Sequence, residues 1–411
     1  MAHQLEQSRR PEAEGGRPAE APPRRGPRRH RSIHGRRALA GWAFVTPTLV
    51  ILGLFLFIPI VMALWVSVSD WTGRGSPFSR DVGFVGLDNY ARLFTEPGLT
   101  RSDFMTSLRN NVYYVLLVVP SQTVLALFLA TILNNQLLKA KGFFRTAFYF
   151  PSVTSSVAIS LVFLFLFTGT GAVNTFLSYF GIDAPTWFAD SRGLLHLLGD
   201  GLGLWDAGSP PEPLVTTQVL GLSAWEWLAG PSVALTVIIT LVIWTTTGTF
   251  LLLFLAALQD VPVEVEEAAR VDGANRWERF RAVTLPHLRP TVLLVLTLGL
   301  IGTWQVFDQV YVMTQGGPGK TTLTPAFLSY FYAFESFEWG VAAAMSFVLF
   351  AIIFVLTSVQ RWLFRDKDAA AERKAAKRRR RGARGQGPGE SESWGLKHSN
   401  TATSQTGGGT A

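Results

Sequence analysis

Six long apolar runs constrain this 411-residue chain more than any other feature. They cover residues 41–68, 111–133, 147–167, 233–258, 291–313 and 340–363. About 20 apolar residues are enough for a helix to cross the hydrocarbon core of a bilayer. No run has Lys or Arg in its middle. The sequence therefore predicts an all-α integral membrane protein with six transmembrane helices.

The composition narrows the class of protein further. Charged residues make up 16% of the chain, against about 25% in soluble proteins. The chain has no cysteine, which rules out disulfides and thiolate metal sites. The histidines are scattered and none lies in the middle of an apolar run, so we expect no buried histidine metal centre. The net charge of +8 could suit nucleic acid, but the Arg-rich stretches adjoin apolar runs. Cytoplasmic retention and attraction to anionic lipid explain such stretches better.

Two polar tails flank a membrane domain that we place at residues 39–365. Residues 1–38 are rich in Arg, Pro, Gly and Glu and nearly lack large apolar side chains, which predicts a disordered basic tail. They are too long and too charged for the basic region of a signal peptide, and the apolar run that follows is also too long. Residues 366–411 are charged and then rich in Gly, Ser and Thr, which predicts a second disordered tail.

Basic residues predict the orientation, because Lys and Arg of short loops stay on the cytoplasmic side. They gather after the second run, after the fourth run and in the C-terminal tail: Lys139, Lys141, Arg145, Arg270, Arg276, Arg279, Arg281, Arg289 and the stretch KAAKRRRRGAR. The opposite loops hold only Arg192 in residues 169–231 and Lys320 in residues 314–339. The first outer loop is less clear, with arginines offset by acids. We expect a multi-pass protein of the cell membrane with both termini cytoplasmic.

The polar stretch 260–290 between the fourth and fifth runs reads as two short helices. Pro262 suits a first helical turn, with Asp260 as its cap. Gly273 can end this helix in a left-handed conformation. Asn275 with Glu278 forms a capping box for a second helix, which Leu285-Pro286 should end. By spacing alone, a plain connecting loop is the favoured explanation of the stretch.

The residues of this stretch are more specific than their spacing. Glu267-Ala268-Ala269, then Gly273, then Val283 and Leu285-Pro286 resemble the EAA loop of ABC-importer permeases. Val283 departs mildly, since isoleucine is frequent there. The surrounding EEAARVDGANRWERFRAVTLPHLRPT is similar to carbohydrate permeases of the maltose and glycerol-phosphate type. The resemblance extends over residues 42–364.

The resemblance implies a permease subunit that imports a sugar or related polyol and is not itself an enzyme. A coupling helix would dock on a dimer of separate ATPase subunits, which would bind the ATP and Mg, while this chain would bind no cofactor or metal. The coupling residues would be Glu267, Ala268, Ala269, Asp272, Gly273, Leu285 and Pro286. A second permease subunit, in a heterodimer, and an extracytoplasmic solute-binding protein would complete the transporter.

Polar residues near the end of the fifth run are candidates for the translocation pathway, because polar groups inside a membrane are costly unless they face a cavity or each other. Gln305, Asp308 and Gln309 would share one helical face, and Trp304, Phe307 and Tyr311 would flank it. Carboxylates and carboxamides bind hydroxyls, and aromatic rings pack against sugar rings. The alternative is a hydrated, structural Asp308 near the membrane surface. The sugar-permease family carries a similar stretch, which favours the pathway.

Other polar residues within the runs favour packing over solute contact. The threonines around Thr246 can bond their own helix. A kink first and cavity lining second is the interpretation of Pro120, Ser121 and Gln122 in the second run and of Pro151, Ser152, Thr154, Ser155 and Ser156 in the third. The tryptophans of residues 169–231 suit a membrane interface or contact with a solute-binding protein; they are Trp187, Trp205, Trp225 and Trp227.

Three further interpretations can be weighed. The stretch GGPGKTT at residues 316–322 lacks the first glycine of a phosphate-binding loop, since that position is Thr314. An ion-coupled secondary transporter would rely on Asp308 and leave the EAA-like loop unexplained. A membrane enzyme would need acids, histidines or a nucleophile gathered at one depth, and the apolar runs lack such a cluster.

Overall fold

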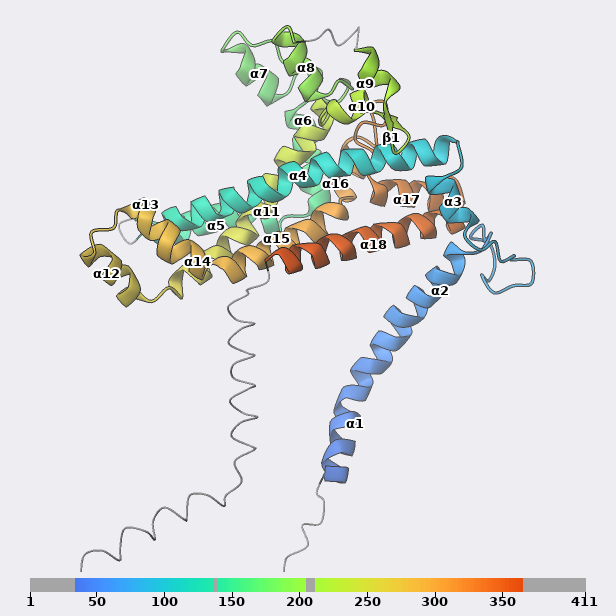
Figure 1. Cartoon of the computed structure of the whole chain (residues 1–411), viewed down its shortest axis with the longest axis horizontal. Helices are drawn as coiled ribbons and strands as arrows, with labels where there is room; N and C mark the ends of the chain where they lie inside the picture. The colour runs from blue at the N-terminus through green and yellow to red at the C-terminus, as the bar shows by residue number, and fades with distance from the viewer. Residues whose placement is uncertain (1–33, 136–138, 205–210, 365–411) are drawn as a thin grey trace, which may run out of the picture. The chain divides into compact units, whose positions relative to one another are not determined.

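A computed structural model of the chain describes residues 34–135, 139–204 and 211–364, which are mostly α-helical (Figure 1). The predicted C-terminal tail and residues 1–33 of the predicted N-terminal tail lie outside the described residues. The first helix, α1 (His34–Leu52), begins inside the stretch that we assigned to that tail. The chain divides into two units, residues 1–61 and 62–411.

The described part of the first unit belongs to one apolar helical stretch, which ends inside the second unit. α1 continues through the short π-helix η1 (Gly53–Phe57) into α2 (Ile58–Ser67). Residues Gly41–Ser67 are long and apolar enough to cross a membrane, and only 6% of their most apolar window is buried. The first apolar run therefore forms a helix, as predicted.

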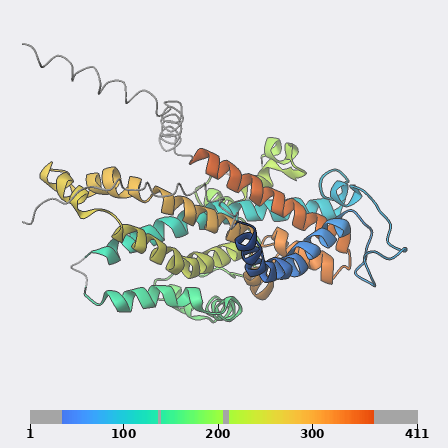
Figure 2. The same ribbon diagram turned by 90° about the horizontal axis from the view of Figure 1, so that it is seen from below.

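The second unit is built on long helices that run roughly side by side (Figure 2). α4 (Leu99–Asn134) packs against α11 (Val233–Gln259) and α15 (Arg289–Trp304). α5 (Lys141–Val153) covers another side of α11, and α18 (Trp339–Leu363) packs against α15 and α17 (Pro325–Phe334). The short α3 (Asp88–Phe94) joins α18 and α4 at one end. Buried side chains of α4 and α11 supply much of the core.

Four of the predicted runs are single helices that could span a membrane, namely Gly41–Ser67, Leu99–Asn134, Val233–Gln259 and Trp339–Leu363. The third run is not one continuous helix, and its break lies among the residues that the sequence marks as kink candidates. It bends by 98° between α5 and α6 (Ser156–Leu166). The hydroxyls of Ser152 and Thr154 bond to carbonyls of Tyr149 and Phe150, and Thr154 is extended. Such bonds compete with the helical ladder, and Pro151 removes a donor from it.

The fifth run is also interrupted. α15 ends at Trp304, and after residues 305–307 the chain starts a new short helix, α16 (Asp308–Met313). A further bend of 68° separates α15 from the helical stretch Arg276–His287 that precedes it. That stretch comprises α13 (Arg276–Arg279), the π-helix η2 (Phe280–Thr284) and α14 (Leu285–His287).

Residues 169–231 form a small folded segment of their own. It contains α7 (Ala172–Ser178), α8 (Leu194–Gly201), α9 (Glu212–Thr216), α10 (Ala224–Leu228) and a two-stranded hairpin, β1 (Gln218–Val219) with β2 (Leu222–Ser223). The strands are antiparallel, with Val219 opposite Leu222. A bridge between Gly193 and Ser232 brings the two ends of residues 193–232 together.

The tryptophans of this segment hold it together. Trp187 Nε1 donates to Asn174 Oδ1 at 2.6 Å, and Trp227 Nε1 donates to the Val219 carbonyl at 3.0 Å. Trp225 stacks on His196 with ring centroids 3.9 Å apart. These contacts lie within residues 169–231. Neither of our two predictions, a membrane interface or contact with a partner protein, included such internal contacts. Trp205 lies outside the described residues.

Candidate functional site

The first candidate site is the hairpin formed by α12 (Val263–Val271) and α13. Our prediction of Asp260 as the cap of α12 was wrong. α11 extends to Gln259, and Asp260 is its C-cap residue, in a helical conformation. The residue at the cap position is Pro262, in an extended conformation and without a side-chain capping bond.

The turn of the hairpin agrees with the sequence. Gly273 has φ of +82°, the left-handed conformation expected of it. Asn275 Oδ1 accepts hydrogen bonds from the backbone N–H groups of Trp277 and Glu278 at 2.9 Å. Glu278 Oε2 in turn accepts from the Asn275 N–H at 2.8 Å. The predicted capping box is therefore present and fixes the start of α13.

Leu285-Pro286 does not end the second helix of this region, contrary to our prediction. The helix passes through η2 and α14 and stops at Leu288, which is fully buried. Pro286 lies in the first turn of α14, where its missing N–H leaves no bond unmade. The wider π-helical turn before Pro286 accommodates the missing hydrogen bond, so the proline is tolerated inside the helical stretch.

The outer surface of the hairpin has no partner within the described part of the chain. α12 has no buried residue. Val263, Val271 and Trp277 are 62%, 87% and 67% exposed. Glu267 and Ala268 are also exposed, Ala269 is half-buried, and Glu267 forms no ion pair with any described residue. Apolar side chains exposed together in this way typify a protein-binding surface.

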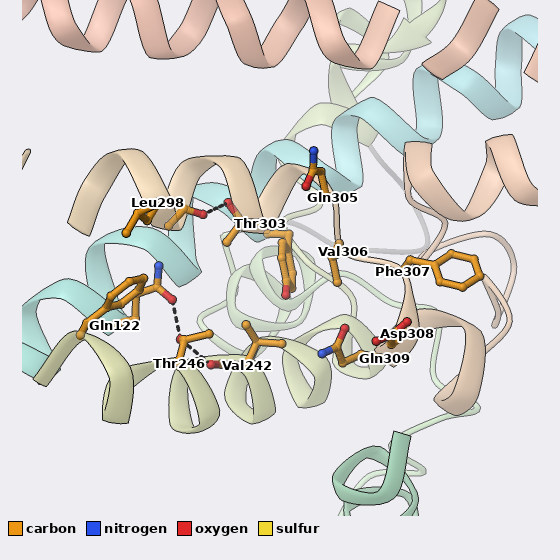
Figure 3. A pocket seen from close by; sticks show the side chains of 14 residues that line it. Gln122, Val242, Thr246, Leu298, Thr303, Gln305, Val306, Phe307, Asp308 and Gln309 are labelled. Atoms are coloured by element: carbon orange, nitrogen blue, oxygen red, sulfur yellow. Dashed lines mark hydrogen bonds between the residues drawn. The ribbon is translucent and has the colours of Figure 1, made fainter. Parts of the chain in front are cut away.

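The second candidate site is a pocket of about 240 Å³ enclosed by α4, α11, α15 and the start of α16 (Figure 3). The lining residues are Tyr114, Gln122, Val242, Thr246, Phe250, Leu298, Gly299, Gly302, Thr303, Gln305, Val306, Phe307, Asp308 and Gln309. Gln122 and Thr246 lie at one end, and Phe307 and Asp308 lie at the other.

Gln305, Asp308 and Gln309 meet at this pocket, but not for the reason we gave. They do not share one helical face, because α15 ends before Gln305 and α16 begins at Asp308. All three line the pocket at the break between the helices. Two bonds hold the break in place: Thr324 Oγ1 donates to the Val306 carbonyl at 3.1 Å, and Gln309 Nε2 donates to Ser156 Oγ at 3.0 Å.

The three aromatic residues predicted to flank the polar ones, Trp304, Phe307 and Tyr311, lie in different environments. Phe307 lines the pocket. Trp304 does not, because it is buried in a cluster with Leu349 and Ile353 of α18. Tyr311 lies outside the lining and packs its ring 5.4 Å from the rings of both Phe307 and Tyr330.

Two residues that line the pocket, Gln122 and Thr246, were predicted from the sequence to serve helix packing first. Thr246 Oγ1 donates to Gln122 Oε1 at 2.6 Å, which joins α11 to α4 across the pocket. The neighbouring Thr245 and Thr247 bond carbonyls of their own helix, as the packing interpretation requires. A carboxamide in the middle of an apolar run was the signal that could have identified Gln122.

The pocket can bind hydroxyl groups but holds no reactive cluster. It combines carboxamides, threonine hydroxyls and one carboxylate with an apolar wall. Within the described ranges, no group of three or more His, Cys, Asp or Glu side chains could hold a metal ion. The GGPGKTT stretch is the turn between α16 and α17, and Lys320 pairs there with Asp103 at 2.6 Å.

Two titratable groups of residues 169–231 are shifted from their ordinary pKa values. Hydrogen bonds from the Arg192 guanidinium lower the pKa of the Asp190 carboxyl. Burial lowers the pKa of the His196 imidazole, and the charge of Arg109 adds to this, while the hydrogen bond to the Trp225 carbonyl acts in the opposite direction.

Comparison with known proteins gives consistent matches. Residues 110–368 match the family described as "Binding-protein-dependent transport system inner membrane component". The chain is 32% identical over 330 residues to the lactose transport system permease protein LacF of Rhizobium radiobacter, covering 80% of this chain and 94% of that protein. It is 31% identical over 324 residues to the trehalose/maltose transport system permease protein MalF of Thermococcus litoralis, covering 79% and 93%.

A solved structure has the same fold. A chain of the bacterial alginate ABC transporter, crystallised with an alginate pentasaccharide-bound periplasmic protein, superposes with a TM-score of 0.59 at 20% identity. The match covers 80% of this chain and 95% of that one.

Proposed function

The chain belongs to the family of binding-protein-dependent transport system inner membrane components and is a permease subunit of a sugar-importing ABC transporter; from this premise we propose that the α12–α13 hairpin couples it to a separate ATPase and that the pocket is part of its solute pathway. It is a multi-pass membrane protein rather than an enzyme, and it works with a solute-binding protein. The ion-coupled alternative is not favoured.

The coupling proposal is carried by the exposed surface of the hairpin. Its backbone is fixed by the Gly273 turn and the Asn275–Glu278 capping box, while Val263, Val271 and Trp277 remain exposed. A rigid element with exposed apolar side chains suits a groove on another protein. The resemblance to the EAA loop supplies that partner, an ATPase dimer that binds ATP and Mg.

Each coupling residue then has a defined part. Glu267, exposed and without an ion-pair partner, makes the charged contact with the ATPase. Ala268 and Ala269 allow close approach to the groove. Gly273 sets the angle of the hairpin, and the capping box keeps α13 in line with η2 and α14. Motion of the ATPase dimer thereby reaches α15, which follows α14 directly.

The pathway proposal is supported by the composition of the pocket. Gln305, Asp308 and Gln309 offer donors and acceptors for the hydroxyls of a sugar, and Phe307 offers a ring face. The volume of about 240 Å³ is below the usual range for an enclosed small-molecule site, roughly 300–1,000 Å³. A second permease subunit, in a heterodimer, would complete the site, and the solute-binding protein would deliver the sugar to it.

From the positive-inside pattern of the sequence we further propose that the hairpin and both tails are cytoplasmic and that the chain crosses the membrane six times. The two bent helix pairs would then each count as one crossing. The 169–231 segment would face the outside, on the side from which a solute-binding protein arrives.

Co-purification from native membranes tests the coupling proposal. Gly273→Pro is incompatible with φ of +82°, because proline fixes φ near −65°. We expect the parent chain to retain an ATPase subunit and the variant to lose it, together with ATP-driven sugar uptake. Gly75→Pro is the matched control, since Gly75 also has positive φ, of +68°, but lies in the first loop outside the hairpin.

The proposal fails if no ATPase accompanies the parent chain under gentle conditions, or if Gly273→Pro retains the ATPase and full uptake. Uptake that survives collapse of the ion gradient but stops when ATP is depleted separates the importer from an ion-coupled transporter.

A further inference from the structure

The Gln122 carboxamide forms a hydrogen bond with its oxygen but not with its nitrogen, among the described residues. Its Oε1 accepts a hydrogen bond from Thr246 Oγ1 at 2.6 Å. Its Nε2 has no hydrogen-bond partner among the residues that the structure describes, although the atom is buried and the whole residue is only 1% exposed. A buried donor without a partner costs about 1–3 kcal/mol of folding free energy. An oxygen brought to that N–H in another state of the transporter would remove this cost.

The free nitrogen faces a glycine of α15. Figure 3 shows the Gln122 nitrogen pointing away from Thr246, toward the helix that carries Leu298. A Cβ placed on Gly299 would lie 2.5 Å from Gln122 Nε2. Because Gly299 has no side chain, α15 can lie against this N–H without a clash.

The position of Gln122 complements the polar groups at the other end of the pocket. Asp308 accepts hydrogen bonds from hydroxyl groups, whereas a free amide N–H donates to an oxygen. A polyhydroxylated solute has both kinds of atom. The two groups lie at opposite ends of the same pocket, so one solute could meet an acceptor at one end and a donor at the other.

We propose that Gln122 is a second solute-binding residue, whose Nε2 donates to an oxygen of the transported sugar at the end of the pocket remote from Asp308, with Thr246 as its positioning residue. The proposal rests on the pocket being the solute pathway. Because Nε2 is covered in this conformation, the sugar reaches it when α15 moves away from α4 during transport. The Thr246 hydroxyl holds Oε1 and so keeps Nε2 on the side of α15.

Thiol labelling tests whether position 122 faces the pathway, and it needs no knowledge of the sugar. The chain has no cysteine, so a single introduced cysteine reports on one position only. Gln122→Cys, Gln305→Cys and Val118→Cys are compared in the assembled transporter during ATP turnover, with 2-aminoethyl methanethiosulfonate as the probe. Gln305 is an exposed pocket residue, and Val118, one turn from Gln122 on α4, is fully buried outside the pocket lining.

We expect cysteine at 122 to react during turnover, as at 305, and cysteine at 118 to stay unreactive. Reaction at 305 without reaction at 122 would overturn the assignment of Gln122 and leave the pathway proposal standing. Absence of reaction at 305 would instead overturn the pathway proposal itself, and with it the role of Gln122.

A sugar-uptake comparison separates binding from packing. Gln122→Met keeps the length of the side chain and removes the donor, and we expect uptake of the transported sugar to fall about tenfold. Gln360→Met is the matched control, because Gln360 on α18 also has unpartnered amide atoms but does not line the pocket. Lactose, maltose and trehalose serve as the probe sugars, at saturating solute-binding protein.

Equal uptake by Gln122→Met and the parent would contradict the proposal, as would an equal fall in both methionine variants. Thr246→Val should give a smaller fall than Gln122→Met, because it loosens the amide without removing it.

Discussion

The α12–α13 hairpin and the pocket owe their shapes to different kinds of contact. The hairpin is held by bonds between residues at most five positions apart, such as Asn275 with Glu278 and Ala274 with Ala269. The pocket joins groups far apart in sequence, such as Gln122 with Thr246 and Gln309 with Ser156. Local bonds make an element that keeps its form while its surface binds elsewhere. Contacts between helices make a site whose form changes whenever those helices move.

The same contrast fits the two tasks of a transporter. A coupling element has to transmit motion without being deformed, and a solute site has to open and close. The break at residues 305–307 and the free Gln122 amide both belong to the second region.

The largest expected difference in stability is between two variants in which a glycine is replaced by alanine, one in the helix packing and one in the hairpin. A Cβ on Gly248 would lie 2.3 Å from the Phe148 carbonyl oxygen, whereas a Cβ on Gly273 would meet nothing within 4 Å. We expect Gly248→Ala to destabilise the whole membrane domain by about 1–3 kcal/mol, because α5 and α11 must separate. Gly273→Ala should cost about 1 kcal/mol, from its positive φ alone, and only within the hairpin.

Thermal unfolding followed by intrinsic tryptophan fluorescence checks this pair. The midpoint should fall for Gly248→Ala and stay near that of the parent for Gly273→Ala. Equal shifts in the two variants would mean that the hairpin is not independent of the helix packing.

The two capping boxes of the chain provide a second, smaller contrast. Asn275 caps the hairpin, and Ser223 forms the same motif with Glu226 in the 169–231 segment. Removing either cap by alanine should cost about 1 kcal/mol locally. Hydrogen exchange should rise in residues 276–284 for Asn275→Ala and in residues 224–228 for Ser223→Ala. Only Asn275→Ala should weaken retention of the ATPase, and weakening by Ser223→Ala would count against the hairpin as the coupling element.

The smallest effect should come from pH, and only in the 169–231 segment. Burial lowers the pKa of His196, so the folded segment favours the neutral ring. Its stabilising contribution is complete above the ordinary pKa of about 6.5 and is lost as the pH falls from there toward the lowered value. Hydrogen exchange in α8 should therefore increase on acidification from neutral pH. His196→Phe keeps an aromatic ring against Trp225 and should reduce this dependence, while the hairpin should show none of it.

The sequence predicted what depends on local chemistry. The Gly273 turn, the Asn275–Glu278 capping box and the four uninterrupted spans follow from residue type and spacing, and the structure has all of them. The pocket residues Gln305, Asp308 and Gln309 were found because polar groups are rare in apolar runs. The prediction that they share one helical face was wrong, because an apolar run carries no local signal that α15 ends at Trp304.

The bend between α5 and α6 follows from local bonds of Ser152 and Thr154. The burial of Trp304 against α18 depends instead on neighbours distant in sequence. The importance of Gln122 was underestimated for the same reason, since its bond partner Thr246 is 124 positions away.

The bridge between Gly193 and Ser232 has a consequence for how such chains can diverge. Backbone bonds beside it, from Leu194 to the Pro231 carbonyl and from Leu195 to the Ala229 carbonyl, fasten the two ends of this stretch to each other. Residues inserted or deleted between these paired ends, away from Leu222 and Trp227 which pack on the core of the helices, would change the size of the stretch without moving the paired ends. The length of this stretch could therefore differ between related transporters while the start of α11 stays in place.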